Sequence, residues 1–138
     1  MSESQNTQTV KDAYAAFLRG DVNAILDMLA DEVEWEGVKG GEGVVPQAGL
    51  RRGKPAIAQF FSQVGANIAF DTFEPREFVA QGDHVVAIGS YSGKAIPTGG
   101  TMASDWVMVF NFRDGKIARF REFTDSAQLV RAFAGVTV

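Results

Sequence analysis

Apolar and polar residues follow two different rhythms along the chain. Before Phe70, apolar side chains recur three or four positions apart, which is typical of amphipathic helices. From Phe70 onward they recur at every second position, which is typical of strands with one buried face. The pattern predicts helices over 10–18, 22–29 and 55–64, a short strand over 32–36, four strands over 73–80, 84–95, 103–112 and 116–124, and a last helical turn after Asp125.

Residues with special backbone preferences mark the ends of these elements. Gly20 ends the first helix, and Asp21 is a suitable N-cap for the second. Pro55 suits the first turn of the third helix. Three helices followed by an antiparallel meander predict one α+β domain over residues 1–138, with the helices on one face of the sheet. The polar residues 1–8 are expected to be disordered.

The segment from Gly37 to Gly49 has neither rhythm. It contains five glycines and one proline, and irregular segments of this length in small domains are usually functional or mobile. Few of its side chains look able to anchor it, so we expect the most mobile part of the fold between Val10 and Phe133. We interpret it as a lid over a site.

The strand that contains Trp106 is apolar on both of its faces. Trp106, Met108 and Phe110 lie on one face, and Val107 and Val109 lie on the other. An antiparallel strand with one solvated face should instead be polar at alternate positions. Because the helices cover only one face, we expect a second copy of the chain to cover the other, as a homodimer with Val107 and Val109 at the contact.

Composition and charge exclude several classes of protein. A chain of 138 residues with a net charge of −4 lacks the basic surface that nucleic-acid binding requires. No apolar run is long enough to span a membrane, and no signal peptide is visible, so a cytoplasmic protein is expected. With no cysteine and one histidine, His84 in a hairpin turn, neither a metal site nor a histidine-based triad is expected.

Glu122 is the candidate for chemistry. On the strand over 116–124 it shares a face with Ala118, Phe120 and Thr124, and it is the only ionisable side chain among these four. A carboxylate among small and aromatic side chains is costly unless it is used or hydrogen-bonded. The alternative is that Glu122 forms a structural ion pair with an arginine of a neighbouring strand.

Four aromatic residues carry a polar atom that a ligand can use. They are Tyr14, Trp35, Tyr91 and Trp106. Aromatic side chains at such spacing also occur as ordinary core residues, so both interpretations stay open.

Segments spread over most of the chain resemble one family. From about Val10 to Phe133, the sequence resembles the SnoaL-like branch of the nuclear transport factor 2-like superfamily. The resemblance implies a cone-shaped α+β barrel, in which a strongly curved, mostly antiparallel sheet wraps around three N-terminal helices, with a deep apolar pocket and commonly a homodimer. The segments that carry it are 13–17, 20–21, 29–35, 52–54, 106–110 and 113–117.

The match to the enzymes of this superfamily is partial. Glu122 occupies the position of the acid on the last strand of the polyketide cyclases. The epoxide hydrolases also need an Arg and an Asp, where this chain has Gly89 and Tyr91. The ketosteroid isomerases carry their base just after the first strand, where this chain has Gly37. The resemblance therefore implies neither epoxide hydrolysis nor steroid isomerisation.

Three functions remain open. The first is a cofactor-free isomerase or cyclase for an apolar organic substrate, with Glu122 as general acid and base. The second is a ligand-binding domain without chemistry, and the third is a dimerisation scaffold whose interior is filled by its own phenylalanines. A cavity of a few hundred cubic ångströms would favour the first two, and a second polar partner for Glu122 would favour the enzyme. The expected ligand contacts are Tyr14, Trp35, Tyr91, Trp106, Met108 and Phe120.

Overall fold

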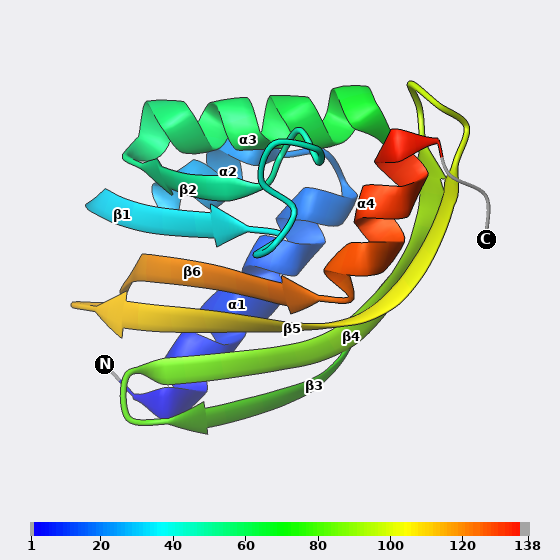
Figure 1. Cartoon of the computed structure of the whole chain (residues 1–138). Coiled ribbons are helices and arrows are strands. Elements are labelled where there is room, and N and C mark those ends of the chain that lie inside the picture. Colours follow the sequence, from blue (N-terminus) through cyan, green and yellow to red (C-terminus); the bar gives the residue numbers. More distant parts are fainter. Residues whose placement is uncertain (1, 136–138) are drawn as a thin grey trace.

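A computed structural model describes residues 2–135, in which a curved six-stranded sheet and four helices form one α+β unit (Figure 1). The helices are α1 (Glu3–Leu18), α2 (Val22–Asp27), α3 (Lys54–Asn67) and α4 (Ser126–Ala134). The strands are β1 (Leu29–Gly37), β2 (Gly49–Arg52), β3 (Ile68–Gln81), β4 (His84–Ala95), β5 (Thr101–Arg113) and β6 (Lys116–Thr124).

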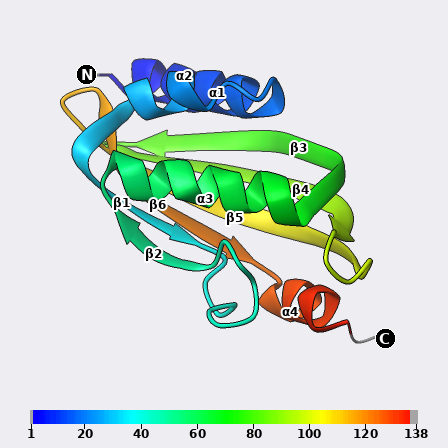
Figure 2. The same cartoon turned by 90° about the horizontal axis from the view of Figure 1, so that it is seen from above.

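The strands lie in the order β2-β1-β6-β5-β4-β3. β1 runs parallel to β6, and all other neighbours are antiparallel. The sheet bends without closing, and α1 and α3 lie inside the bend (Figure 1 and Figure 2). This is the cone that the resemblance implied. The meander after Phe70 is confirmed, and the bounds of β4 and β6 are those that the alternation predicts.

The first helix begins much earlier than expected. α1 starts at Glu3, so the expected disorder of residues 1–8 is wrong for every residue that the structure describes; Met1 lies outside the described range. A capping box explains the early start, because the Ser2 hydroxyl accepts from the backbone N–H of Gln5 while the Gln5 side chain accepts from that of Ser2. Asn6 and Val10 are buried, so tertiary packing also holds this end.

The second and third helices follow their predicted signals. Asp21 caps α2 by accepting from the Ala24 N–H at 3.1 Å, and Pro55 lies in the first turn of α3. α2 ends at Asp27, and Leu29, which was expected on its apolar stripe, begins β1 instead. Its side chain is still buried, so the prediction was right about burial and wrong about the element.

The glycine-rich segment is shorter and better anchored than expected. Its last residue, Gly49, begins β2, which pairs with β1 and was missed because it has only four residues and no clear alternation. Val38, Val45 and Gln47 are all buried, which contradicts the expectation that few side chains anchor the segment. We call residues 38–48 the loop segment. It lies beside the start of α4, where Gly40 approaches Ser126 (Figure 1).

The outer face of the sheet carries an open hollow. Its volume is about 400 Å³. Val107 and Phe123 on this face are 36% and 37% exposed in the single chain. The expectation of a second copy over this face stays a prediction.

No helix in the described part of the chain is long and apolar enough to cross a membrane.

Candidate functional site

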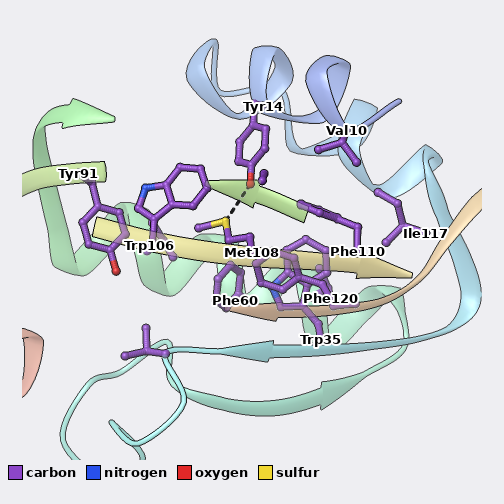
Figure 3. Packing of buried hydrophobic residues seen from close by; sticks show 14 of the residues in the cluster. Val10, Tyr14, Trp35, Phe60, Tyr91, Trp106, Met108, Phe110, Ile117 and Phe120 are labelled. Carbon is purple, nitrogen blue, oxygen red and sulfur yellow. Dashed lines mark hydrogen bonds between the residues drawn. The ribbon is translucent and has the colours of Figure 1, made fainter. Parts of the chain in front are cut away.

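An apolar cavity lies between the concave face of the sheet and helices α1 and α3. Its walls are almost entirely aromatic and aliphatic, and Glu122 is the one ionisable carboxyl among the residues that line it. Figure 3 shows many of these side chains gathered around Met108. The lining residues comprise Ala13, Tyr14, Phe17, Ile25, Trp35, Gln47, Phe60, Phe61, Val64, Ile68, Phe70, Phe73, Tyr91, Met108, Phe110, Phe120 and Glu122.

Glu122 lies where strand alternation predicts, on the inner face of β6. Its side chain is 6% exposed. The Tyr91 hydroxyl donates to Glu122 Oε2 at 2.9 Å, and the backbone N–H of Val38 makes a long bond to Oε1 at 3.4 Å. Among the described residues Glu122 takes part in no ion pair, so the arginine pairing does not occur within this chain.

The surroundings of Glu122 favour its neutral form. Burial raises the pKa of the carboxyl above its ordinary value, while the hydrogen bonds from Tyr91 and Val38 lower it by a smaller amount. A carboxyl group that keeps its proton to a higher pH than an ordinary glutamate is able to donate that proton to a bound molecule. The geometry therefore suits general acid and base chemistry.

Val38 holds its N–H toward Glu122 through an unusual backbone. Its φ is 38°, in the left-handed region that β-branched residues rarely adopt. The side chain is fully buried, which keeps this conformation in place. Strained backbone of this kind collects at functional sites, and here it directs a donor at the one buried carboxyl.

Tyr91 connects Glu122 to further hydroxyl groups. Its oxygen also lies 2.9 Å from Thr124 Oγ1. Burial, and then the nearby Glu122 carboxylate, raise the pKa of Tyr91 far above its ordinary value. Tyr91 therefore stays a neutral phenol that donates one hydrogen bond at a time.

Tyr14 and Met108 also line the cavity, and they contact each other. The Tyr14 hydroxyl lies 3.0 Å from the sulfur of Met108, a contact drawn as a dashed line in Figure 3. Burial raises the pKa of Tyr14 well above its ordinary value. A thioether is a weak acceptor, so this hydroxyl is free to turn toward a better partner.

Trp35 and Phe120 form the aromatic wall on the β1 side. They are neighbours in the parallel pair of β1 and β6, and their rings stack with centroids 3.9 Å apart. The indole N–H of Trp35 is buried and has no hydrogen-bond partner. A buried donor without a partner is costly, and a bound acceptor would satisfy it.

Gln47 is a cavity residue that the sequence did not reveal. Its side chain is 2% exposed, and its amide oxygen has no partner. It lies on the loop segment, where no periodicity indicates which side chains turn inward. The only available signal was a polar residue inside an irregular segment, which does not predict burial.

Trp106, expected as a ligand contact, does not line this cavity. Its ring stacks on Tyr14 at 5.5 Å and lies against Gly89, where an added Cβ would come within 2.5 Å of the indole. Strand alternation was right about its face. The glycine opposite it across β4 and β5 leaves room for the ring to lie flat in the core instead of projecting into the cavity.

Gly37 also has no room for a side chain. An added Cβ would lie 2.6 Å from the Phe60 ring and 2.9 Å from the backbone oxygen of Gln47. A carboxylate cannot be placed there without moving both neighbours, which agrees with the absence of an isomerase base at this position.

The cavity is small. Its volume is about 70 Å³, well below the few hundred cubic ångströms of a typical ligand site. The size favours an interior filled by its own aromatic side chains, whereas the two polar partners of Glu122 favour an enzyme.

In the described part of the chain, no three His, Cys, Asp or Glu side chains lie together in a way that suits a metal ion.

Comparison with known proteins identifies relatives of this fold. The crystal structure of an NTF2-like protein from Burkholderia xenovorans LB400 is 36% identical with a TM-score of 0.86, covering 96% of this chain and 98% of that one. TerC, co-crystallised with polyporic acid, is 28% identical with a TM-score of 0.82, covering 94% and 98%.

A curated relative and a family match complete the comparison. An uncharacterized PhzA/B-like protein of Pseudomonas aeruginosa is 33% identical over 66 residues, which make up 46% of this chain and 47% of that protein. The chain therefore matches about half of that relative. A SnoaL-like domain matches residues 10–120. With this match over most of its length, the chain belongs to the SnoaL-like family of the NTF2-like superfamily.

Proposed function

We propose that this protein is a cofactor-free enzyme that moves a proton on an apolar organic substrate, in an isomerisation or cyclisation next to a carbonyl group. Glu122 is the general acid and base, and Tyr91 keeps its carboxyl oriented through the 2.9 Å hydrogen bond. The observation that carries the proposal is a single buried carboxyl, without an ion pair in the described chain and with a raised pKa, in an otherwise apolar cavity.

The unpartnered polar atoms of the cavity support a substrate with polar groups on an apolar frame. The Trp35 N–H suits a carbonyl oxygen, and the Gln47 amide oxygen suits a hydroxyl or N–H group. Both atoms are buried without partners, so a substrate that supplies the two bonds removes two unfavourable desolvation terms. The complex of the related TerC with polyporic acid supports a small organic ligand of this general kind.

Substrate binding must enlarge the cavity. Phe60 from α3 and Gln47 from the loop segment both line it, and Gly37 lies directly against both residues. Outward movement of the loop segment releases Gln47 and gives the Phe60 ring room to turn. The site is thus formed as the substrate binds, which also keeps water out of the empty enzyme.

The proposed proton transfer can be tested with simple ketones, whose protons next to the carbonyl are weakly acidic, so the natural substrate need not be known. Exchange of the protons next to the carbonyl of 2-tetralone and acetophenone is followed by NMR in D₂O. We expect the wild type to accelerate exchange for at least one ketone, and Glu122→Gln to lose about 10²–10⁴-fold of that acceleration. Glu32→Gln is the matched control, because Glu32 is an exposed glutamate outside the cavity. Equal rates for wild type and Glu122→Gln would contradict the proposal.

The small cavity favours one second candidate, a dimerisation domain with a self-filled interior. In that case polyporic acid and the ketones do not bind, and Glu122→Gln changes only stability. The second copy would cover the outer face, where Val107 and Phe123 are partly exposed. Light scattering is expected to give a dimer for the wild type and a shift toward monomer for Val109→Lys. A monomeric wild type at micromolar concentration would contradict the dimer.

A further inference from the structure

A chain of hydroxyl groups leads from buried Glu122 to half-buried Ser104, near the start of β5 and the end of β6. The Tyr91 oxygen lies 2.9 Å from both Glu122 Oε2 and Thr124 Oγ1. Thr124 Oγ1 lies 2.8 Å from the hydroxyl of Ser104. Ser104 and Thr124 are each only half-buried. The hydroxyl groups therefore connect the buried carboxyl to a partly exposed side chain in steps of hydrogen-bond length.

The strand register explains why these four residues meet. Tyr91 on β4 is opposite Ser104 on β5, and β6 places Glu122 opposite Met108 and Thr124 opposite Trp106. Side chains two positions apart on a strand share a face. Glu122 and Thr124 are therefore neighbours on the inner face of β6, and the phenol of Tyr91 reaches both. The Asp125 N–H fixes the outer end by donating to Ser104 Oγ at 2.9 Å.

We propose that Tyr91, Thr124 and Ser104 form a proton relay that connects Glu122 to solvent. Its role in catalysis rests on the function proposed above, because a buried acid that has given its proton to a substrate must regain one while the substrate fills the cavity. The exchange path itself is a property of the protein alone. It is therefore measurable without any substrate.

Each passage along the relay transfers one proton, either outward or inward, and leaves every hydroxyl group neutral. In the structure the Ser104 hydroxyl donates to the backbone oxygen of Asp105 at 2.7 Å, so it must first turn toward solvent. When protonated Glu122 then releases its proton to the Tyr91 oxygen, the phenol proton passes to Thr124, the Thr124 proton to Ser104, and the Ser104 proton to a water molecule. The products are a Glu122 carboxylate and a hydronium ion. Tyr91 now carries the proton that came from Glu122 and donates it to the carboxylate, as in the structure. Reprotonation follows the same path in reverse.

Tyr91 is suited to this role because its single proton has two acceptors at the same distance. It donates to Glu122 when the carboxyl is ionised, and to Thr124 when Glu122 is protonated and donates to it. Its strongly raised pKa prevents the phenol from trapping the relay as a phenolate. The remaining contact of the carboxyl, the Val38 N–H, belongs to a backbone amide and offers no comparable path.

The test measures how fast the Glu122 carboxyl exchanges its proton for deuterium. The carbonyl stretch of the protonated carboxyl is assigned in infrared spectra by its loss in Glu122→Gln. After a pH titration, rapid mixing with D₂O is carried out below the midpoint, where Glu122 is protonated. We expect Thr124→Val to exchange at least tenfold more slowly than the wild type, because valine has the same shape and no hydroxyl. Thr124→Ser restores the hydroxyl and is expected to exchange like the wild type.

Two further measurements separate the relay from loosening of the fold. Ser104→Ala removes the outer link and should also slow the carboxyl exchange, although it does not touch Glu122. Backbone amide exchange of residues 38–48 should be the same in all variants. Wild-type carboxyl exchange in both Thr124→Val and Ser104→Ala would overturn the relay and assign the path to opening of the loop segment. Such a result would overturn the relay without changing the outcome of the ketone assay. Conversely, if the ketone assay contradicts the proposed function, the variants should still differ from the wild type in carboxyl exchange.

Discussion

The two tyrosines of the chain occupy similar surroundings and do different things. Tyr14 on α1 and Tyr91 on β4 are 8% and 4% exposed, and both line the cavity. For both, burial is the main cause of a raised pKa and the Glu122 carboxylate is a second cause. They differ in their partners, because Tyr14 contacts the weak acceptor Met108 and Tyr91 contacts Glu122 and Thr124.

The difference in hydrogen-bond partners distinguishes a tyrosine that packs in the core from a tyrosine that is placed for chemistry. The Tyr14 ring is surrounded by Phe73, Phe78, Trp106 and Phe110, so it works chiefly as a core side chain. Around Tyr91, hydroxyl and carboxyl groups replace part of that aromatic shell. Burial alone therefore does not identify a functional tyrosine, whereas its hydrogen-bond partners do.

The comparison is tested most directly by removing each hydroxyl. Tyr91→Phe takes a donor away from buried Glu122, and we expect the free energy of unfolding to fall by about 1–3 kcal/mol. Tyr14→Phe removes only a bond to sulfur and is expected to cost less than about 0.5 kcal/mol. Urea unfolding at pH 7 measures both. Equal losses for the two variants would mean that the Tyr91 hydrogen bonds add nothing beyond packing.

A second prediction concerns the pH dependence of stability. The folded-state pKa of Glu122 is raised, so between the unfolded value of about 4.3 and the folded value the native state binds more protons than the unfolded state. Wild-type stability should therefore fall as pH rises through this window, by about 1.4 kcal/mol for each unit of pKa difference.

Glu122→Gln provides the reference for that measurement. It carries no ionisable group at this position, so its stability relative to the wild type should increase with pH across the window and become constant above the folded pKa. Unfolding is followed from pH 4 upward in both proteins. A difference that stays constant with pH would show that Glu122 titrates as an ordinary surface glutamate.

Strand alternation predicted the part of the site that lies on regular strands. It placed Glu122 and Phe120 on the inner face of β6, and both are buried there. It also gave Trp106 the correct face. It could not predict how the indole lies, because that depends on Gly89 being opposite it in the neighbouring strand.

The rest of the site depends on contacts that local patterns do not encode. Gln47 and Val38 lie on the loop segment, which has no period, and both are buried there. Tyr91 and Ser104 meet Thr124 through a register between three strands. At the N-terminus the Ser2 and Gln5 capping signal was present, but the apolar pattern begins only at Val10. The helix start was therefore placed too late.

The smallest expected effect concerns the attachment of the loop segment. Arg51 on β2 donates to the backbone oxygens of Gln47 at 2.8 Å and Pro46 at 3.4 Å, and its guanidinium lies 5.5 Å from the centre of the Phe60 ring. Arg51→Met keeps an apolar stem beside Phe60 and removes both hydrogen bonds. We expect faster amide hydrogen exchange within residues 38–48 and a loss of stability of about 0.5–1.5 kcal/mol.

The adjacent arginine supplies the control for this last prediction. Arg52 points into solvent, with 71% of its side chain exposed, and its one ion pair within residues 2–135 is with Glu34 at 3.4 Å. Arg52→Met should leave exchange in the loop segment unchanged, since an exposed ion pair contributes little. If Arg51→Met and Arg52→Met exchange alike, the buried side chains Val38, Val45 and Gln47 hold the loop segment without help from Arg51. Opening of the cavity would then require those side chains to leave the core, so substrate binding would be limited by a rarer and slower movement than release of one arginine.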